Sequence, residues 1–133
     1  MASPELQQKL ANLPPINVLN RRCPSNDVLD MIADKWTVLV IYALRDNTWR
    51  YSDLERMIDG ISQKMLTQTL RKLERNGLVV RTVYPVVPPK VEYVLTDLGS
   101  SLHEVLRPLC KWSQTHMPDI LGAQEIYDNS TSS

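Results

Sequence analysis

The chain has 133 residues, of which 43% are hydrophobic and 23% are charged, and its 15 basic and 15 acidic residues give no net charge. This length and balance are typical of one soluble domain with a single hydrophobic core. No apolar run approaches the roughly 20 residues that cross a bilayer, and the N-terminus lacks the basic and apolar segments of a signal peptide. We therefore expect a cytoplasmic protein that does not enter a membrane. The two cysteines are too few for a disulfide framework.

The first part of the chain predicts two helices. Residues 1–12 form a short helix that Ser3 caps. After a connector, Ser25 or Asn26 caps a second helix that extends to Leu44. This helix is apolar nearly all round in its second half, so we expect it to be the buried centre of the domain.

The middle of the chain predicts a pair of helices joined by a turn. Residues 49–51 have the size of a very short strand, and Ser52 begins a short helix in which Glu55 is placed for a capping box. The inward-facing residues of this helix are Leu54, Met57 and Ile58. Ser62 caps the next helix, and Gly77 supplies the left-handed residue that ends it.

A β-hairpin and a long helix complete the prediction. The hairpin pairs residues 78–84 with residues 91–95 through a tip stiffened by prolines. Thr96 caps the last helix, which Pro108 should kink and Pro118 should end.

The order of these elements predicts the fold class. A helix pair followed at once by a two-stranded hairpin is the plan of the winged helix-turn-helix. The class is therefore mainly α with a small β-hairpin, an α+β arrangement. We assign residues 1–128 to a single domain, with a DNA-reading part at about 25–96, and residues 129–133 to a disordered tail.

The helix that begins after Ser62 has two different faces. On a wheel with about 100° per residue, one stripe holds Leu66, Leu70 and Leu73. The opposite face carries cations and hydrogen-bonding amides, which suit a helix that lies in the DNA major groove. The residues expected to reach base edges are Gln63, Lys64, Thr67 and Gln68. With the flanking cations and the hairpin, the full predicted DNA-binding set is Ser62, Gln63, Lys64, Thr67, Gln68, Arg71, Lys72, Arg75, Arg81 and Lys90.

The distribution of charge favours the same interpretation. Residues 61–90 hold six cations and one acid, a local charge of +5 in a chain of zero net charge. One basic surface on an otherwise acidic molecule is typical of a nucleic-acid interface. The alternative for the helix alone is an ordinary solvated charged face.

Several stretches of the sequence resemble the HxlR-type regulators, a bacterial branch of the winged helix-turn-helix proteins in the MarR-like superfamily. The matching stretches are Cys23-Pro24 and residues 34–37, 50–54, 60–68, 73–81 and 84–99. The resemblance runs from about Cys23 to Trp112, with Tyr51 where the family usually has phenylalanine. It implies a DNA-binding transcriptional regulator.

The resemblance also implies a homodimer on an inverted-repeat operator, held together by the N-terminal and C-terminal helices. The leucine stripe of the last helix agrees, although such a stripe alone is more often plain core. Pro108 departs from the usual pattern and puts the exact dimer geometry in doubt. The predicted interface residues are Leu6, Leu10, Leu98, Leu102, Val105, Leu109 and Trp112.

The cysteines suggest that the protein senses oxidants or electrophiles. Some members of the family sense oxidants or electrophiles through a cysteine just before the proline that opens the second helix, and Cys23 matches that position. The helix N-terminus together with Arg21 and Arg22 would favour its thiolate. Cys110 is a weaker candidate, either a partner for Cys23 from the other subunit or small apolar filler.

Two other classes of function remain to be compared with a DNA-binding repressor. A winged helix that binds only protein is the main alternative, but it would not need a carboxylate-free cationic helix face. An enzyme is disfavoured because no catalytic or phosphate-binding motif is present and the two histidines, His103 and His116, lie well apart on one helix. No cofactor and no metal site are expected.

Overall fold

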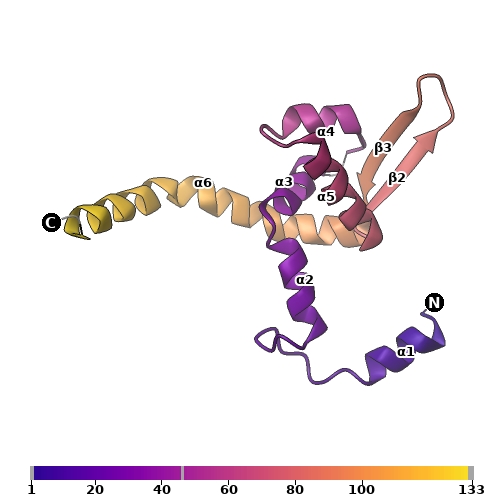
Figure 1. Cartoon of the computed structure of the whole chain (residues 1–133), viewed down its shortest axis with the longest axis horizontal. Coiled ribbons are helices and arrows are strands. Elements are labelled where there is room, and N and C mark those ends of the chain that lie inside the picture. The colour runs from indigo at the N-terminus through magenta and orange to yellow at the C-terminus, as the bar shows by residue number, and fades with distance from the viewer. Residues whose placement is uncertain (1, 46, 132–133) are drawn as a thin grey trace.

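The computed structural model describes residues 2–45 and 47–131, which are mainly helical with one small antiparallel sheet (Figure 1). The helix α3 packs against the first half of α6, α4 and α5 pack against α3, and the β2–β3 hairpin projects from one end. The second half of α6 runs out of the body, and α2 leads away from it to α1. The elements are α1 (Pro4–Ala11), α2 (Pro24–Ile32), α3 (Lys35–Leu44), β1 (Trp49–Arg50), α4 (Tyr51–Met57), α5 (Gln63–Arg75), β2 (Val79–Tyr84), β3 (Lys90–Leu95) and α6 (Asp97–Thr131).

The hydrophobic core lies around α3, as the sequence predicts. Val40, Ile41 and Leu44 of this helix are fully buried. The core is completed by one face of α5, by single residues of α4 and α6, and by the sheet. These residues include Leu54, Leu66, Leu70, Leu73, Leu78, Val79, Leu95 and Leu106.

The sheet has three strands in the order β1-β3-β2, because the predicted short strand pairs with the hairpin. Trp49 lies opposite Tyr93, and Arg50 lies opposite Glu92. The Trp49 indole N–H also donates to the Leu44 carbonyl at 2.9 Å, which fixes the end of α3 against the strand. The hairpin itself pairs Val79↔Leu95 through Tyr84↔Lys90.

The predicted continuous helix from residue 25 to residue 44 is wrong, because the structure divides it at Ala33 and Asp34 into α2 and α3. The Asp34 carboxylate accepts a hydrogen bond from the Trp36 N–H at 2.8 Å and caps α3. The apolar pattern continues across the break, so periodicity alone does not reveal it. The expected caps Ser25 and Asn26 are also wrong, because α2 begins at Pro24 with Cys23 as its N-cap.

The short helix α4 begins one residue earlier than predicted. Its capping contact comes from Asp53, whose carboxylate accepts from the Arg50 N–H at 3.1 Å, and not from Glu55. Leu54 and Ile58 are buried as expected, but Met57 is 43% exposed, so its predicted inward position is wrong.

The predicted end of the last helix at Pro118 is wrong, because α6 continues through Pro108 and Pro118 to Thr131. Each proline leaves one carbonyl without a helical partner, those of Glu104 and Gln114. Both residues are exposed, so water can satisfy these groups. Helix therefore occupies residues 129–131 of the expected tail, and Ser132 and Ser133 lie outside the described residues. Within residues 2–45 and 47–131, no helix has the length and apolarity needed to cross a membrane.

The start of α6 is locked to the turn between α5 and β2. The Thr96 hydroxyl accepts from the Gly99 N–H at 3.0 Å, which confirms the predicted cap, and it donates to the Gly77 carbonyl at 2.6 Å. A Cβ atom on Gly99 would overlap the carbonyl oxygen of Leu78. Glycine is required here because the helix and the strand approach each other so closely.

Candidate nucleic-acid interface

The helix α5 is built so that one face is buried and the other is free. The Ser62 hydroxyl accepts from the Met65 N–H at 3.0 Å and caps it. At its other end Gly77 adopts a φ of 74°, as expected for a left-handed stop. Leu66, Leu70 and Leu73 are buried. The opposite face is exposed and carries Gln63, Lys64, Gln68, Arg71 and Arg75.

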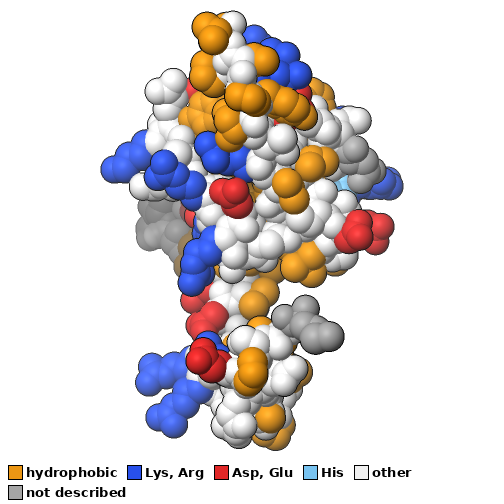
Figure 2. Space-filling view, turned by 90° about the vertical axis from the view of Figure 1, so that its right-hand side faces the viewer, with side chains coloured by type: hydrophobic (Ala, Val, Ile, Leu, Met, Phe, Trp, Pro, Cys, Tyr) orange, Lys and Arg blue, Asp and Glu red, His pale blue; other side chains and the backbone are white. Residues whose placement is uncertain are grey.

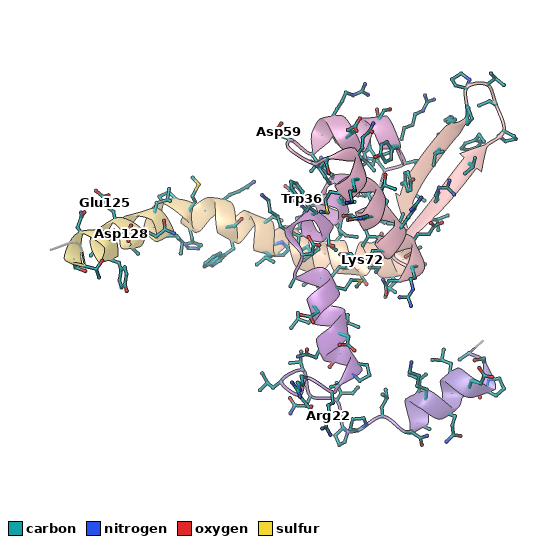
Figure 3. The ribbon with its side chains drawn as sticks, in the orientation of Figure 1. Arg22, Trp36, Asp59, Lys72, Glu125 and Asp128 are labelled. Atoms are coloured by element: carbon teal, nitrogen blue, oxygen red, sulfur yellow. The ribbon has the colours of Figure 1, made fainter. Side chains whose placement is uncertain are left out.

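Two of the predicted DNA contacts on α5 have partners within the chain. The Thr67 hydroxyl is half-buried and lies 3.0 Å from the hydroxyl of Tyr51, which also donates to the Gln63 carbonyl. The Lys72 ammonium lies 3.4 Å from the Asp34 carboxylate that caps α3 (Figure 3). The exposed face therefore offers Lys64 and Gln68 more freely than Thr67 and Lys72.

A hollow between α5 and the sheet brings two predicted cations together. Arg71 of α5 and Arg81 of β2 line a cavity of about 250 Å³ that also touches Glu74. Both arginines are exposed. The positive charge of the helix thus continues onto the first strand of the hairpin.

The last predicted cation, Lys90, is held within the hairpin. Its ammonium lies 2.8 Å from a carboxylate oxygen of Glu92 and 5.0 Å from the centre of the Tyr84 ring. The hydrogen bond from Lys90 is the largest cause of the lowered pKa of Glu92. Lys90 is therefore one member of a charge cluster rather than an isolated cation.

One face of the molecule carries both cationic and apolar side chains. Figure 2 shows Lys and Arg side chains on the flank of the body, below an apolar patch on the tip of the hairpin. In that tip Val86 is 52% exposed and Val87 is 99% exposed.

One cation beside the exposed face of α5 was not predicted from the sequence. Arg50 is exposed, it precedes α4, and it lies opposite Glu92 across the sheet. Sequence reasoning could not find it, because the strand pairing that brings Arg50 to the hairpin is not local.

The second candidate site is Cys23, whose side chain is only 2% exposed. Its sulfur lies 2.9 Å from the Ser25 hydroxyl. This hydrogen bond is the largest cause of the lowered pKa of Cys23, followed by backbone hydrogen bonds at Asn17, Ser25 and Asn26. The lowered pKa of Cys23 was expected, and the backbone groups of Ser25 and Asn26 at the N-terminus of α2 contribute to it as predicted, but the predicted contribution of Arg21 and Arg22 is wrong. Both arginines are exposed (Figure 3 labels Arg22), and neither contributes to the shift.

Cys110 has the opposite character. It is half-buried on α6, and its burial raises the pKa of its thiol. Both cysteines are free thiols in the structure.

The predicted dimer residues lie mostly on open surface of the single chain. Leu102 packs against the core. The others are between 44% and 67% exposed: Leu6, Leu10, Leu98, Val105, Leu109 and Trp112.

The helix pair α4–α5, followed at once by the β2–β3 hairpin, defines a winged helix-turn-helix domain. The class predicted from the sequence is confirmed. The chain belongs to the HxlR-like helix-turn-helix family, whose sequence profile matches residues 31–120. It is accordingly a transcriptional regulator, and its family is not a class of enzymes.

Three relatives illustrate the similarity. YtfH of Escherichia coli (strain K12), an HTH-type transcriptional regulator, is 44% identical over 109 residues, which cover 82% of this chain and 86% of YtfH. A structure described as the transcriptional regulator ytfH from Salmonella typhimurium is 44% identical, with a TM-score of 0.77, and the match covers 82% of this chain and 97% of that one. The oxidized form of the redox regulator HypR is 40% identical, with a TM-score of 0.64 and coverage of 70% and 96%.

Proposed function

We propose that this chain is a sequence-specific DNA-binding regulator that binds an inverted-repeat operator as a homodimer. The observation that carries the proposal is the exposed face of α5, on which Lys64, Gln68 and Arg71 project from a helix whose other face is buried. Amides and cations on such a face can read base edges in the major groove, and no carboxylate lies at its centre, since Glu74 is at the side.

The division of labour within the interface follows from position and exposure. Gln63, Lys64 and Gln68 lie in the first part of α5, where a recognition helix reaches base edges. Arg71 and Arg75 come later and suit phosphates, as does Arg81 on β2. Ser62 acts by capping the helix, and Thr67 and Lys72 act through their ties to Tyr51 and Asp34. The DNA-reading part would thus fall within residues 25–96, as the sequence suggests.

The homodimer supplies the symmetry that an inverted repeat requires. The exposed apolar residues of α1 and α6, among them Leu10, Leu109 and Trp112, are the surface we assign to the second copy. Large apolar side chains gathered on open surface favour association. Two-fold symmetry then places the two α5 helices about 34 Å apart, one turn of the double helix.

The salt dependence of DNA binding tests this proposal and separates it from a winged helix that binds only protein. We expect the logarithm of the affinity to fall linearly with the logarithm of salt concentration, by about 0.9 for each phosphate contacted. Fluorescence anisotropy with a labelled duplex measures this slope. Affinity that is absent at low salt, or independent of salt, would reject DNA binding and leave the protein-interaction alternative.

We further propose that the regulator is a repressor. A dimer seated across a promoter blocks polymerase without needing any further contact, whereas activation needs a dedicated surface for polymerase. Transcription in vitro from a promoter that contains the selected operator should fall when the protein is added. An increase would reverse this assignment.

A second function, sensing of oxidants or electrophiles through Cys23, is favoured by one specific observation. The Ser25 hydroxyl and neighbouring backbone groups stabilise the Cys23 thiolate, and the thiolate is the nucleophile in thiol chemistry. The relative HypR is described as a redox regulator. Because the thiol is buried, the loop over residues 17–22 must open before a reagent can reach it. Modification there would disturb the start of α2 and the connector that leads to α1, and would so alter the spacing of the two recognition helices.

Gel shifts with wild type, Cys23→Ser and Cys110→Ser test the sensing proposal. Treatment with diamide or a quinone should change the DNA affinity of wild type but not of Cys23→Ser. Cys110→Ser keeps the response if Cys23 alone is modified, and loses it if an intersubunit disulfide forms. A Cys23→Ser protein that responds like wild type would disprove the role of Cys23 while leaving the DNA-binding proposal intact.

A further inference from the structure

A cavity of about 480 Å³ lies between the hairpin and the start of α4. One wall is the sequence Arg50-Tyr51-Ser52, where β1 passes directly into α4. The other wall is residues 86–91, the tip and the first part of β3. The cavity therefore lies between two segments that are distant in sequence, and these are brought together by the pairing of β1 with β3 and by the packing of α4 against β3.

Two charged side chains, those of Arg50 and Lys90, line this cavity, and Glu92 lies beside them on β3. Arg50 lies opposite Glu92 in the antiparallel register, so the two side chains share one face of the sheet. Lys90, two residues from Glu92 along the same strand, points to the same face and pairs with the Glu92 carboxylate at 2.8 Å. The positive charges of Lys90 and Arg50 both lower the pKa of Glu92. Two cations and one carboxylate leave the cluster with one positive charge in excess.

Tyr51 links the cavity to α5. Tyr51 lines it, and the hydroxyl of the same residue donates to the Gln63 carbonyl at 3.0 Å and lies 3.0 Å from the Thr67 hydroxyl. A duplex seated on α5 would therefore carry its sugar-phosphate backbone past Tyr51 toward the hairpin.

We propose that the cavity holds a backbone phosphate of the bound DNA between Arg50 and Lys90, with the Ser52 hydroxyl as a further donor. This inference rests on the proposed DNA binding and extends it to Arg50 and Ser52, where β1 passes into α4. The phosphate neutralises the excess positive charge of the cluster, and a guanidinium is well suited to hold it by two hydrogen bonds. Glu92 competes with the phosphate for both cations, so it limits the affinity of the site.

The role of Glu92 predicts that its removal raises the affinity for DNA. A cluster that only stabilised the fold would not give an increase. Glu92→Gln removes the competing charge and should raise affinity for duplex DNA about threefold to tenfold, with a salt slope steeper by about one. Arg50→Ala should lower affinity by a similar factor and reduce the slope by about one. The double variant Arg50→Ala, Glu92→Gln restores the charge of the cluster and should return the slope to that of wild type.

The measurement is fluorescence anisotropy with a labelled 30-base-pair duplex of random sequence, because a phosphate contact does not depend on sequence. Glu104→Gln and Arg107→Ala make the same charge changes on exposed positions of α6 and serve as controls. Thermal melting of each variant confirms folding. If Arg50→Ala does not fold, Arg50→Lys replaces it, because it retains the charge and removes the paired hydrogen bonds of the guanidinium.

Three results separate the outcomes. No DNA binding by wild type overturns the proposed function itself. Normal binding by wild type, with Arg50→Ala and Glu92→Gln indistinguishable from it, overturns the phosphate site alone. Equal effects of Glu92→Gln and Glu104→Gln would also overturn the site, because they would mean that only the net charge of the molecule matters.

Discussion

The winged body and the terminal helices differ in how far their apolar residues are buried. In the body, from α3 to Leu106 in the first part of α6, the large apolar residues of the helices are mostly buried by their own chain, and Ile41, Leu54 and Leu66 are fully enclosed. In the terminal helices they are exposed, with Leu10 at 54% and Trp112 at 53%, although α1 and the far half of α6 are both well-formed helices (Figure 1). The body encloses its own core, whereas the outer parts of the terminal helices leave apolar surface that a second copy would cover.

This difference assigns separate tasks to the two regions. In the proposed complex the body would present α5 and the hairpin to DNA. The terminal helices would determine how far apart two such bodies lie. Substitutions in the body should therefore act on stability and base reading, and substitutions in the terminal helices on assembly.

The largest effect is expected from charge placed on the exposed stripe of α6. The pair of changes Leu109→Asp and Trp112→Asp should convert a dimer of twice the 15.2 kDa chain mass into a monomer, because burying two carboxylates in an apolar interface is costly. Loss of one of two linked half-site contacts should lower operator affinity about a hundredfold or more. Sedimentation and anisotropy measure the two quantities. Gln114→Asp, on the other side of the helix, should leave both unchanged.

Gly99→Ala should be the most damaging single methyl group in the body. The added Cβ overlaps the Leu78 carbonyl oxygen, which belongs to the backbone and cannot rotate away. We expect the free energy of unfolding to fall by about 2–3 kcal/mol. Gly122→Ala is the matched control, because no atom lies within 4 Å of its added Cβ, and it should stabilise the free helix by roughly 0.5–1 kcal/mol. Chemical denaturation that ranks the two variants equally would disagree with this packing.

Base reading should respond to Gln68→Ala and Lys64→Ala. Each good base contact contributes about 1–3 kcal/mol of discrimination, so each change should reduce operator affinity more than affinity for random DNA. Gln124→Ala, on the far part of α6, is the control for loss of an exposed amide. If both α5 variants keep the wild-type preference between operator and random DNA, another surface reads the sequence.

The smallest effect is expected from removing the helix caps, one in the body and one in a terminal helix. Ser62 and Ser3 each accept a backbone N–H, at 3.0 Å and 3.1 Å, so the local contact is the same in α5 and α1. Ser62→Ala should lower the free energy of unfolding by about 1 kcal/mol because α5 is part of the core. Ser3→Ala should leave the unfolding of the body unchanged in dilute protein. Equal losses would mean that α1 folds cooperatively with the body of its own chain.

Local signals account for the parts of the fold that the sequence predicted well. The helix α5 has a capping serine, a leucine stripe and a terminal glycine, and each acts within a few residues of its own position. Asp34 was missed because the apolar pattern runs across it, although its carboxylate caps a new helix. The path of α6 through Pro118 was missed because an exposed helix can leave a carbonyl to water.

The residues of the candidate sites also divide into those that local spacing predicts and those that depend on contacts between distant segments. Exposure on the outer face of α5 was predictable from helical spacing, and Lys64, Gln68 and Arg75 are exposed as expected. The cluster of Arg50 and Glu92 depends on the register between β1 and β3, which no local pattern specifies. The buried state of Cys23 depends in the same way on how its flanking loop folds over it.

Selection of bound sites from a pool of random DNA duplexes tests the central claim most directly. The purified full chain is incubated with the pool, the bound duplexes are recovered and amplified, and the cycle is repeated before sequencing. The account predicts an inverted repeat whose half-sites lie about 34 Å apart, and loss of the enrichment when Gln68 and Lys64 are both replaced by alanine. Enrichment of a single unrepeated element, or of no element at all, would contradict a dimer that reads DNA through α5.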